Sequence, residues 1–228
     1  MAGRVVHVHR LARAATMSGV DNPLDSDVDA LRRRWSTRHP AMSHVGALLV
    51  ARYADPSRVY HELTHLSDVL DRIDDLADEC PDPTLVELAG WFHDAVYDVR
   101  RADNELASAD LATALLTPYL TGEQVGEVAR LVLLTRDHAV TDGDANGAVL
   151  CDADLAVLAG GPSAYRDYTE RVRREYAHVS DDDFRSGRDD VLRRLLALSA
   201  LFHTRHGTEH WEQPARANLQ RELTTLLT

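Results

Sequence analysis

Residues 84–98 have the sequence TLVELAGWFHDAVYD, and this stretch is the most informative part of the chain. Its apolar residues recur every three or four positions, as on one face of a helix: Leu85, Leu88, Ala89 and Phe92. The spacing predicts a helix from Thr84 to near Tyr97. Two polar residues, His93 and Asp94, stand inside this apolar run. Neighbours on a helix point about 100° apart, so this pair can reach one ligand only near a helix end or across a shallow cleft.

The same helical spacing recurs along most of the chain, whereas the alternation typical of strands is almost absent. Proline, glycine and capping residues separate the helical segments. We expect helices over about residues 27–35, 43–53, 57–79, 84–97, 103–119, 121–134, 148–158, 162–178, 180–204 and 212–227. The sequence therefore predicts an all-α fold, a helical bundle without a sheet.

The chain has 228 residues, of which 44% are hydrophobic and 27% charged, as is usual for a globular protein. This length suffices for one domain with an extension. We expect residues 27–228 to form a single domain. Residues 1–26 contain several arginines and no long apolar stretch, and we expect them to form a disordered N-terminal arm.

Charge and cysteine content limit the partners and the cellular location that are expected for the chain. The formal net charge is −12, which opposes binding to a phosphate backbone, so no nucleic-acid partner is expected. There is no apolar run of about 18 residues, so no membrane span is expected either. The only cysteines, Cys80 and Cys151, are too few for a disulfide framework, and a cytoplasmic location fits them best.

Two further segments carry polar groups that need an explanation: His61-Glu62-Leu63-Thr64-His65 and Cys151-Asp152-Ala153-Asp154-Leu155. Histidines four residues apart lie on the same face of a helix and can approach one ligand. A carboxylate in an apolar helix needs a cation, a metal or a hydrogen-bond donor. Each feature alone is ordinary in proteins, but their order along one chain is specific. Mixed imidazole and carboxylate ligands suit magnesium or a transition metal better than calcium.

The order His, His-Asp, Asp resembles the HD-domain superfamily of metal-dependent phosphohydrolases, and more closely its small predicted-phosphohydrolase branch. The resemblance covers about residues 28–225. It implies an HD-domain helical bundle with additional C-terminal helices. The motifs that carry it are Tyr60-His61-x-x-x-His65, Trp91-Phe92-His93-Asp94-x-Val96-Tyr97-Asp98, Asp103-Asn104-Glu105-x-x-Ser108-Ala109, Asp152-Ala153-Asp154-Leu155, Arg174-Glu175-Tyr176, Gly187-Arg188 and Ala215-Arg216-x-Asn218-Leu219-x-x-Glu222.

The resemblance implies four ligands for one divalent ion: His65, His93, Asp94 and Asp154. The ion could be Mn, Mg, Co, Ni, Fe or Zn. The family pattern favours His65 over His61, because an apolar helical stretch follows the first ligand. It favours Asp154 over Asp152, because the last ligand sits in an Ala-Asp pair. Both choices stay open to a shift within one helical turn. His61 would then contact the substrate or support a ligand, and Asp152 would orient one.

A second metal is a further alternative. Some members of the superfamily bind two metals through additional histidines between the His-Asp pair and the last aspartate. Glu105 and His138 fall near those places, but Glu105 stands where a histidine is usual. Without a metal, Glu105 is an ordinary residue of a first helical turn and His138 an ordinary residue near a helix end.

The implied activity is hydrolysis of a small phosphate ester, with a nucleotide among the candidates, by a metal-activated water. Asp94 or Asp98 could take the proton, and His61 and Glu105 complete the candidate catalytic groups. Three arginines could hold the phosphate: Arg174, Arg188 and Arg216. Each of them could instead pair with an acidic residue of the C-terminal helices. The alternatives are a di-iron oxygenase of the same fold and a metal-binding regulatory module without turnover. The chain could be a monomer or a homodimer.

Overall fold

The computed structural model describes residues 23–226. Within that range the chain forms ten α-helices and no strand, so the predicted all-α class is confirmed. The helices are α1 (Pro23–Arg38), α2 (Ser43–Tyr53), α3 (Leu63–Asp75), α4 (Pro83–Phe92), α5 (Asn104–Leu116), α6 (Gly122–Leu134), α7 (Ala145–Leu155), α8 (Pro162–Glu175), α9 (Asp181–Ala197) and α10 (Glu212–Leu226). None of these helices is long and apolar enough to cross a lipid bilayer.

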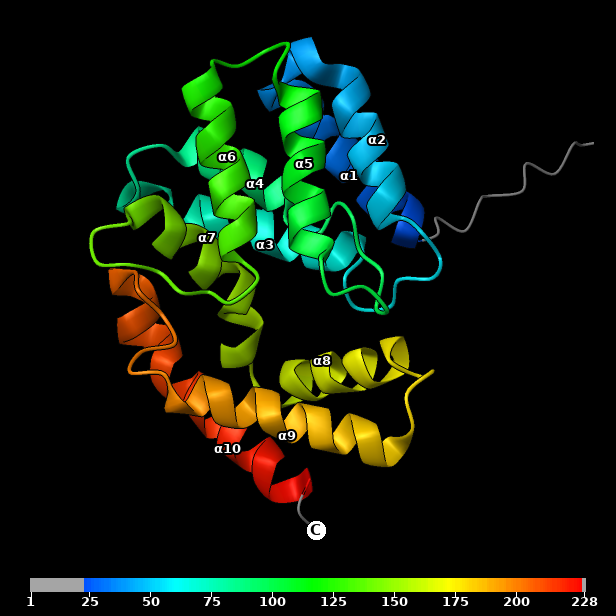
Figure 1. The fold of residues 1–228 in the computed structure, drawn as a ribbon, viewed down its shortest axis with the longest axis vertical. Helices are drawn as coiled ribbons and strands as arrows, with labels where there is room; N and C mark the ends of the chain where they lie inside the picture. The colour runs from blue at the N-terminus through cyan, green and yellow to red at the C-terminus, as the bar shows by residue number, and fades with distance from the viewer. Residues whose placement is uncertain (1–22, 227–228) are drawn as a thin grey trace, which may run out of the picture.

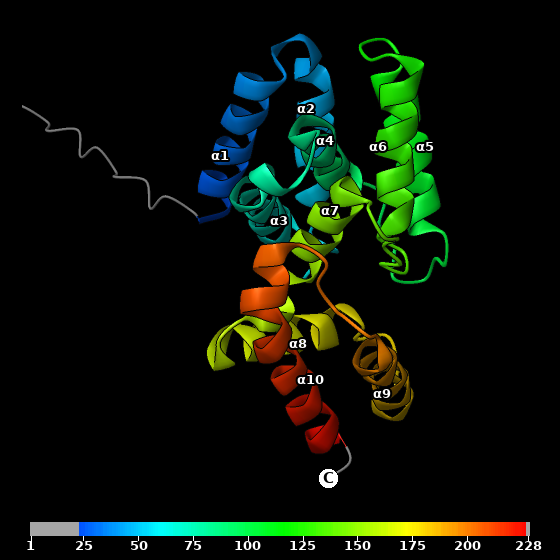
Figure 2. The same ribbon diagram turned by 90° about the vertical axis from the view of Figure 1, so that its left-hand side faces the viewer.

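The helices pack as two groups, α1–α7 and α8–α10 (Figure 1). In the view turned by 90°, α1 lies on one side of the first group and α5 and α6 on the other, with α3, α4 and α7 between them (Figure 2). Each group has its own buried apolar core. The indole ring of Trp211 packs against both cores and so joins the two groups.

Local signals fix several helix starts close to where the sequence predicts them. Asp82 caps α4 by accepting a hydrogen bond from the backbone of Leu85, and Pro83 occupies the first helical position. Thr121 and Gln124 form a capping box at the start of α6. These caps satisfy backbone N–H groups that have no partner within the helix.

The first helix begins earlier than the sequence predicted. Residues 23–26, which were expected in a disordered arm, form the first turn of α1. Proline is favoured at the first helical position, which accounts for a start at Pro23. Residues 1–22 of the predicted arm lie outside the described residues. The periodicity of this helix is confirmed, since Leu31 and Trp35 are buried.

Six helices end at least three residues earlier than expected, among them α4, α8 and α9. α4 stops at Phe92 instead of near Tyr97, α8 stops at Glu175 instead of near residue 178, and α9 stops at Ala197 instead of near residue 204. After α9, backbone N–H groups bond to carboxylates that are distant in the sequence: Leu201 and Phe202 to Glu212, His203 and Thr204 to Asp152, Arg205 and His206 to Glu79. These acceptors replace the carbonyls of a continued helix, so the chain leaves the helical path.

Candidate metal centre

Three helix ends bring polar side chains together between α3, α4 and α7. His65 lies in the first turn of α3, His93 directly follows α4, and Asp154 lies in the last turn of α7. One ligand atom of each lies within 4.8 Å of the others. His65 Nε2 is 3.2 Å from His93 Nε2 and 3.3 Å from Asp154 Oδ1. Two imidazoles and one carboxylate that converge in this way could hold a metal ion.

Asp94 reaches the same point from the turn that follows α4. Its Oδ2 is 3.2 Å from His93 Nε2 and 3.7 Å from His65 Nε2. The turn is held by Arg58, whose Nη1 donates to the Asp94 carbonyl at 2.8 Å, and by Tyr53, whose hydroxyl accepts from the Asp94 N–H. The four residues that the resemblance implied as ligands therefore lie together. We call His65, His93, Asp94 and Asp154 the His–Asp cluster.

A hydrogen bond orients His93 within the cluster. Its Nδ1 lies 2.7 Å from the carbonyl oxygen of Gly90, which can only accept. Nδ1 therefore carries a proton, and in the neutral ring the lone pair is on Nε2, the atom that faces His65 and Asp94. This arrangement is common for histidines that bind metals.

The cluster keeps its carboxylates ionised. Burial opposes the charged form of Asp94, but His93 outweighs this effect and holds the pKa of Asp94 well below its usual range. Burial likewise opposes the charge of Asp154, while His138 and His65 lower the pKa of that carboxyl. For His93, burial is outweighed by Asp94, which raises the pKa of the imidazole to about 9. Two ionised carboxylates in a buried site favour a cation.

The structure brings Asp154, and not Asp152, to the cluster. Asp152 is completely buried. Its carboxylate accepts from the backbone N–H of His203 and from the backbone and hydroxyl of Thr204, the latter at 2.6 Å. Burial raises the pKa of Asp152, although the bonds from Thr204 oppose this. Asp152 thus holds the segment that follows α9.

His61 lies in the turn before α3, so the prediction that it shares a helix with His65 is wrong. The ring still borders the cluster, because its centroid is 5.5 Å from that of His65. Its Nδ1 is 2.5 Å from Glu175 Oε1, and its ring stacks on Tyr97 at a centroid distance of 4.2 Å. Glu175 also accepts the backbone N–H of Tyr60. Glu175 belongs to the motif Arg174-Glu175-Tyr176, but nothing in the sequence indicated that it pairs with His61.

The residues suggested for a second metal are not brought together. His138 Nε2 is 3.0 Å from Asp154 Oδ2, on the edge of the cluster. Within residues 23–226, no hydrogen bond or ion pair joins Glu105 to His138 or to the cluster. Asp98 lies in an exposed turn, where its carboxylate accepts from the backbone of Arg100. A second metal and the catalytic roles of Glu105 and Asp98 stay predictions that this geometry does not favour.

The three arginines suggested for phosphate binding lie in the C-terminal group. Arg188 is buried and donates to both carboxylate oxygens of Glu222, at 2.7 and 3.0 Å. Arg216 bonds to Glu212 and to two carbonyl oxygens at the end of α9. Arg174 is exposed. Arg188 and Arg216 therefore pair with acidic residues of the C-terminal helices, which was the alternative to phosphate binding.

A pocket of about 340 Å³ opens beside the cluster, with His65 and Asp154 in its wall. Two arginines that belong to no motif also line it, Arg72 and Arg171. The Arg171 guanidinium forms an ion pair with Glu62, donates to the carbonyl of Val59 and lies 5.9 Å from the centroid of the Tyr60 ring. Arg72 is exposed and pairs with Asp75, a neighbour on its own helix. Arg171 reaches the pocket from α8 and Arg72 from α3.

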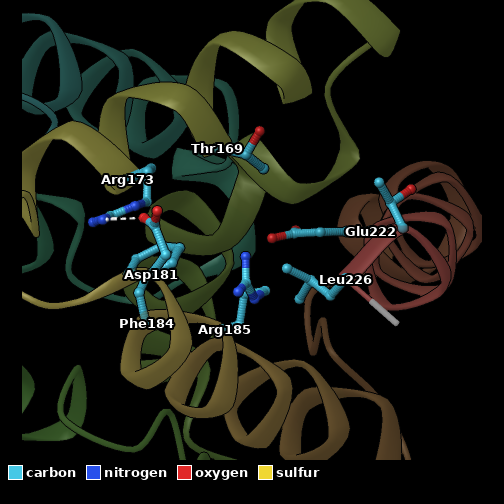
Figure 3. Close-up of a pocket in the computed structure, with 8 residues that line it drawn as sticks. Thr169, Arg173, Asp181, Phe184, Arg185, Glu222 and Leu226 are labelled. Carbon is cyan, nitrogen blue, oxygen red and sulfur yellow. Dashed lines mark hydrogen bonds and ion pairs between the residues drawn. The ribbon is translucent and has the colours of Figure 1, made fainter. Parts of the chain in front are cut away.

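A larger pocket, of about 830 Å³, lies among the C-terminal helices and contains no cluster residue. Figure 3 shows Arg173 and Asp181 facing each other in an ion pair at one side, with Glu222 and Leu226 opposite. Asp181 and Arg185 are exposed to solvent, and the pocket lacks a convergent set of ligand atoms. The smaller pocket, beside the cluster, is therefore the candidate site.

Comparisons with known proteins were made by family, by sequence and by structure. No family model, no curated protein and no solved structure matches the chain. Membership of the HD-domain superfamily therefore stays a prediction.

Proposed function

We propose that this protein is a metal-dependent phosphohydrolase of the HD type that acts on a small phosphate ester. The observation that carries the proposal is the buried His–Asp cluster beside a pocket lined by Arg72 and Arg171. Two imidazoles and two ionised carboxylates form a donor set that fits one ion of Mn, Mg, Co, Ni, Fe or Zn. Arg72 and Arg171 offer charge-assisted hydrogen bonds to an anionic substrate that replaces their partners Asp75 and Glu62. Asp68 and Asp167 line the same pocket.

The residues around the cluster have distinct tasks in this proposal. A divalent ion held there would supply Lewis-acid activation of a phosphoryl oxygen and of water. Arg171 and Arg72 would bind phosphate oxygens in place of Glu62 and Asp75, the carboxylates with which they now pair. His61, anchored through Nδ1 by Glu175, would exchange a proton with the leaving group through its other ring nitrogen.

Neither alternative function has a specific observation in its favour. A di-iron oxygenase needs a second set of ligands, and within the described part of the chain Glu105 does not approach His138. A regulatory module would keep the cluster without turnover. The arginine-lined pocket that adjoins the cluster supports an anionic substrate there, which a purely structural metal would not require.

The proposal is tested by elemental analysis of protein purified without chelator, followed by a phosphatase screen with Mn, Mg, Co and Ni. We expect about one metal ion per chain and metal-dependent release of phosphate. His93→Ala should lose both. His44→Ala, which changes an exposed histidine on α2, should keep both. Hydrolysis that persists in His93→Ala without bound metal would contradict the proposal.

A further inference from the structure

A second pocket, of about 460 Å³, lies on the other side of His61, between the turn before α3 and the helices α8 and α9. We call it the aromatic pocket. Valines from α8, α9 and the turn between them form part of its wall. Four aromatic rings line the rest: Tyr60, Tyr168, Tyr176 and Phe184. A volume of this size is typical of pockets for small molecules, and rings of this kind favour stacking against a flat ligand.

The aromatic pocket adjoins the pocket beside the cluster. Tyr60 and Tyr168 line both, and their rings meet edge to face with centroids 5.0 Å apart. His61 lines the aromatic pocket, and its ring lies 5.5 Å from that of His65. One small molecule could therefore reach the cluster at one end and the aromatic rings at the other.

The arginines of both pockets are paired, but the pairs differ in exposure. Beside the cluster, Arg171 pairs with Glu62 and Arg72 pairs with Asp75. These positions are half-buried or exposed, so a phosphate could replace either carboxylate at little cost.

Arg188, the cation in the wall of the aromatic pocket, is buried, and Glu222 binds it through two hydrogen bonds. Its remaining bond goes to the hydroxyl of Tyr168, at 3.1 Å. Breaking such a buried pair is costly, so Arg188 is not available to an anion. The side chain of Asp183, at the exposed rim, would repel an anion as well.

We propose that the aromatic pocket binds an uncharged planar ring of the substrate while the phosphate occupies the pocket beside the cluster. This inference rests on the proposed function and adds a substrate class to it, the phosphate ester of an alcohol that carries one or two rings. It also gives Arg188 a task, since the arginine holds Tyr168 in the shared wall between the two pockets.

Gly187 provides a sharp test. It lies on α9 in the wall of the aromatic pocket, and a Cβ added there would meet no atom within 4 Å. Gly187→Leu therefore adds an apolar side chain at the wall of the pocket, and its Cβ displaces no atom of the protein. Gly126 on α6 is a matched control, because a Cβ there also meets no atom and the residue is exposed. Both substitutions replace glycine inside a helix, so both favour helix formation to a similar extent.

The first measurement is equilibrium binding of 2-naphthol, an uncharged ring without phosphate, followed by its fluorescence with metal-free protein. Wild type and Gly126→Leu should bind it equally. Gly187→Leu should bind roughly tenfold more weakly or worse, because the leucine occupies the space that the ring needs. Absence of binding to wild type, or equal binding by both variants, would overturn the inference.

The second measurement compares KM for 2-naphthyl phosphate and for methyl phosphate with Mn-loaded protein. Gly187→Leu should raise KM for the naphthyl ester alone. A rise for both esters, or for neither, would contradict a pocket that selects the ring. If 2-naphthol binds as expected while neither ester is hydrolysed, the ring site is supported and the proposed hydrolysis is refuted, so the two failures can be told apart.

Discussion

Two aspartates on α7 have different roles: Asp154 is a candidate metal ligand, whereas Asp152 accepts hydrogen bonds that hold a neighbouring segment. Asp152 and Asp154 are two positions apart, so on a helix they point about 200° apart and face different partners. Asp154→Asn should lose bound metal, because it removes a charged ligand. Asp152→Asn should keep the metal but lower the free energy of unfolding by about 1–3 kcal/mol, because an NH₂ group would face the N–H donors of residues 203–204. Metal analysis and urea unfolding of both variants check these expectations. Metal loss in Asp152→Asn alone would mean that Asp152, and not Asp154, is the ligand.

The sequence predicted the four residues of the His–Asp cluster but not the residues that support them. His65, His93, Asp94 and Asp154 were chosen from a motif, and the structure places all four together. The supporting residues were not predictable, because their roles depend on contacts between distant segments. Arg58 and Glu175 hold backbone groups of the site. Arg58 belongs to no motif, and the motif that contains Glu175 did not indicate this role.

At the level of elements, Glu175 at the end of α8 fixes the turn before α3. Its carboxylate accepts the N–H groups of three residues in that turn, bonds His61 and accepts from the Tyr97 hydroxyl at 2.9 Å. Glu175→Gln should reduce kcat by about 10–100-fold, since a supporting bond to His61 is weakened, while the metal content is unchanged. Exposed Glu170 on the same helix is the control, and Glu170→Gln should have wild-type kcat. An unchanged kcat in Glu175→Gln would show that His61 needs no anchor.

A second carboxylate joins elements of the α1–α7 group. Glu87 on α4 is buried and contacts Arg34 and Arg38 of α1, and His39 just beyond. Burial opposes its charge, but these neighbours outweigh that effect and lower the pKa of Glu87 from 4.5 to about 2. The stability it contributes is complete above pH 4.5 and is lost as the pH falls toward 2, up to about 3 kcal/mol.

Glu87→Gln should therefore be less stable than wild type at pH 7, and the difference between the two should shrink as the pH is lowered from 4.5 to 2. Urea unfolding at a series of pH values measures this. Glu123→Gln, at an exposed position in the first turn of α6, should follow the wild-type curve. A difference between Glu87→Gln and wild type that stays constant across this range would show that the carboxylate is not the group responsible.

Helix starts were more predictable than helix ends. Starts such as those of α4 and α6 depend on local caps that the sequence displays. The end of α9 was placed too late, because carboxylates remote in the sequence accept N–H groups of the segment that follows it, as Glu212 does for Leu201. The chain also leaves α8 earlier than expected, where Arg173 donates to the carbonyls of Tyr176 and Val179. The early end of α4 matters most for function, since His93 becomes the C-cap and Asp94 lies in the turn beyond it, and from there both reach the cluster.

For the whole molecule, the contacts between the two helix groups imply that they unfold together. Trp211 packs against both cores, Asp152 of α7 holds residues 203–204, and Glu175 of α8 holds the turn before α3. A ligand that binds only the first group should then stabilise the entire chain. All four residues of the His–Asp cluster belong to that first group.

Calorimetry of metal-free protein with and without added Mn tests this coupling. An ion at 100 times its Kd adds about 2.7 kcal/mol, and for a chain of this size each kcal/mol moves Tm by about 2–4 °C. We expect one unfolding transition that shifts upward as a whole by roughly 5–10 °C. His65→Ala should show no shift, because it removes a ligand, whereas His44→Ala should shift as wild type does. Two transitions, of which Mn moves only one, would mean that the cores unfold independently and that the carboxylates and Trp211 do not couple them.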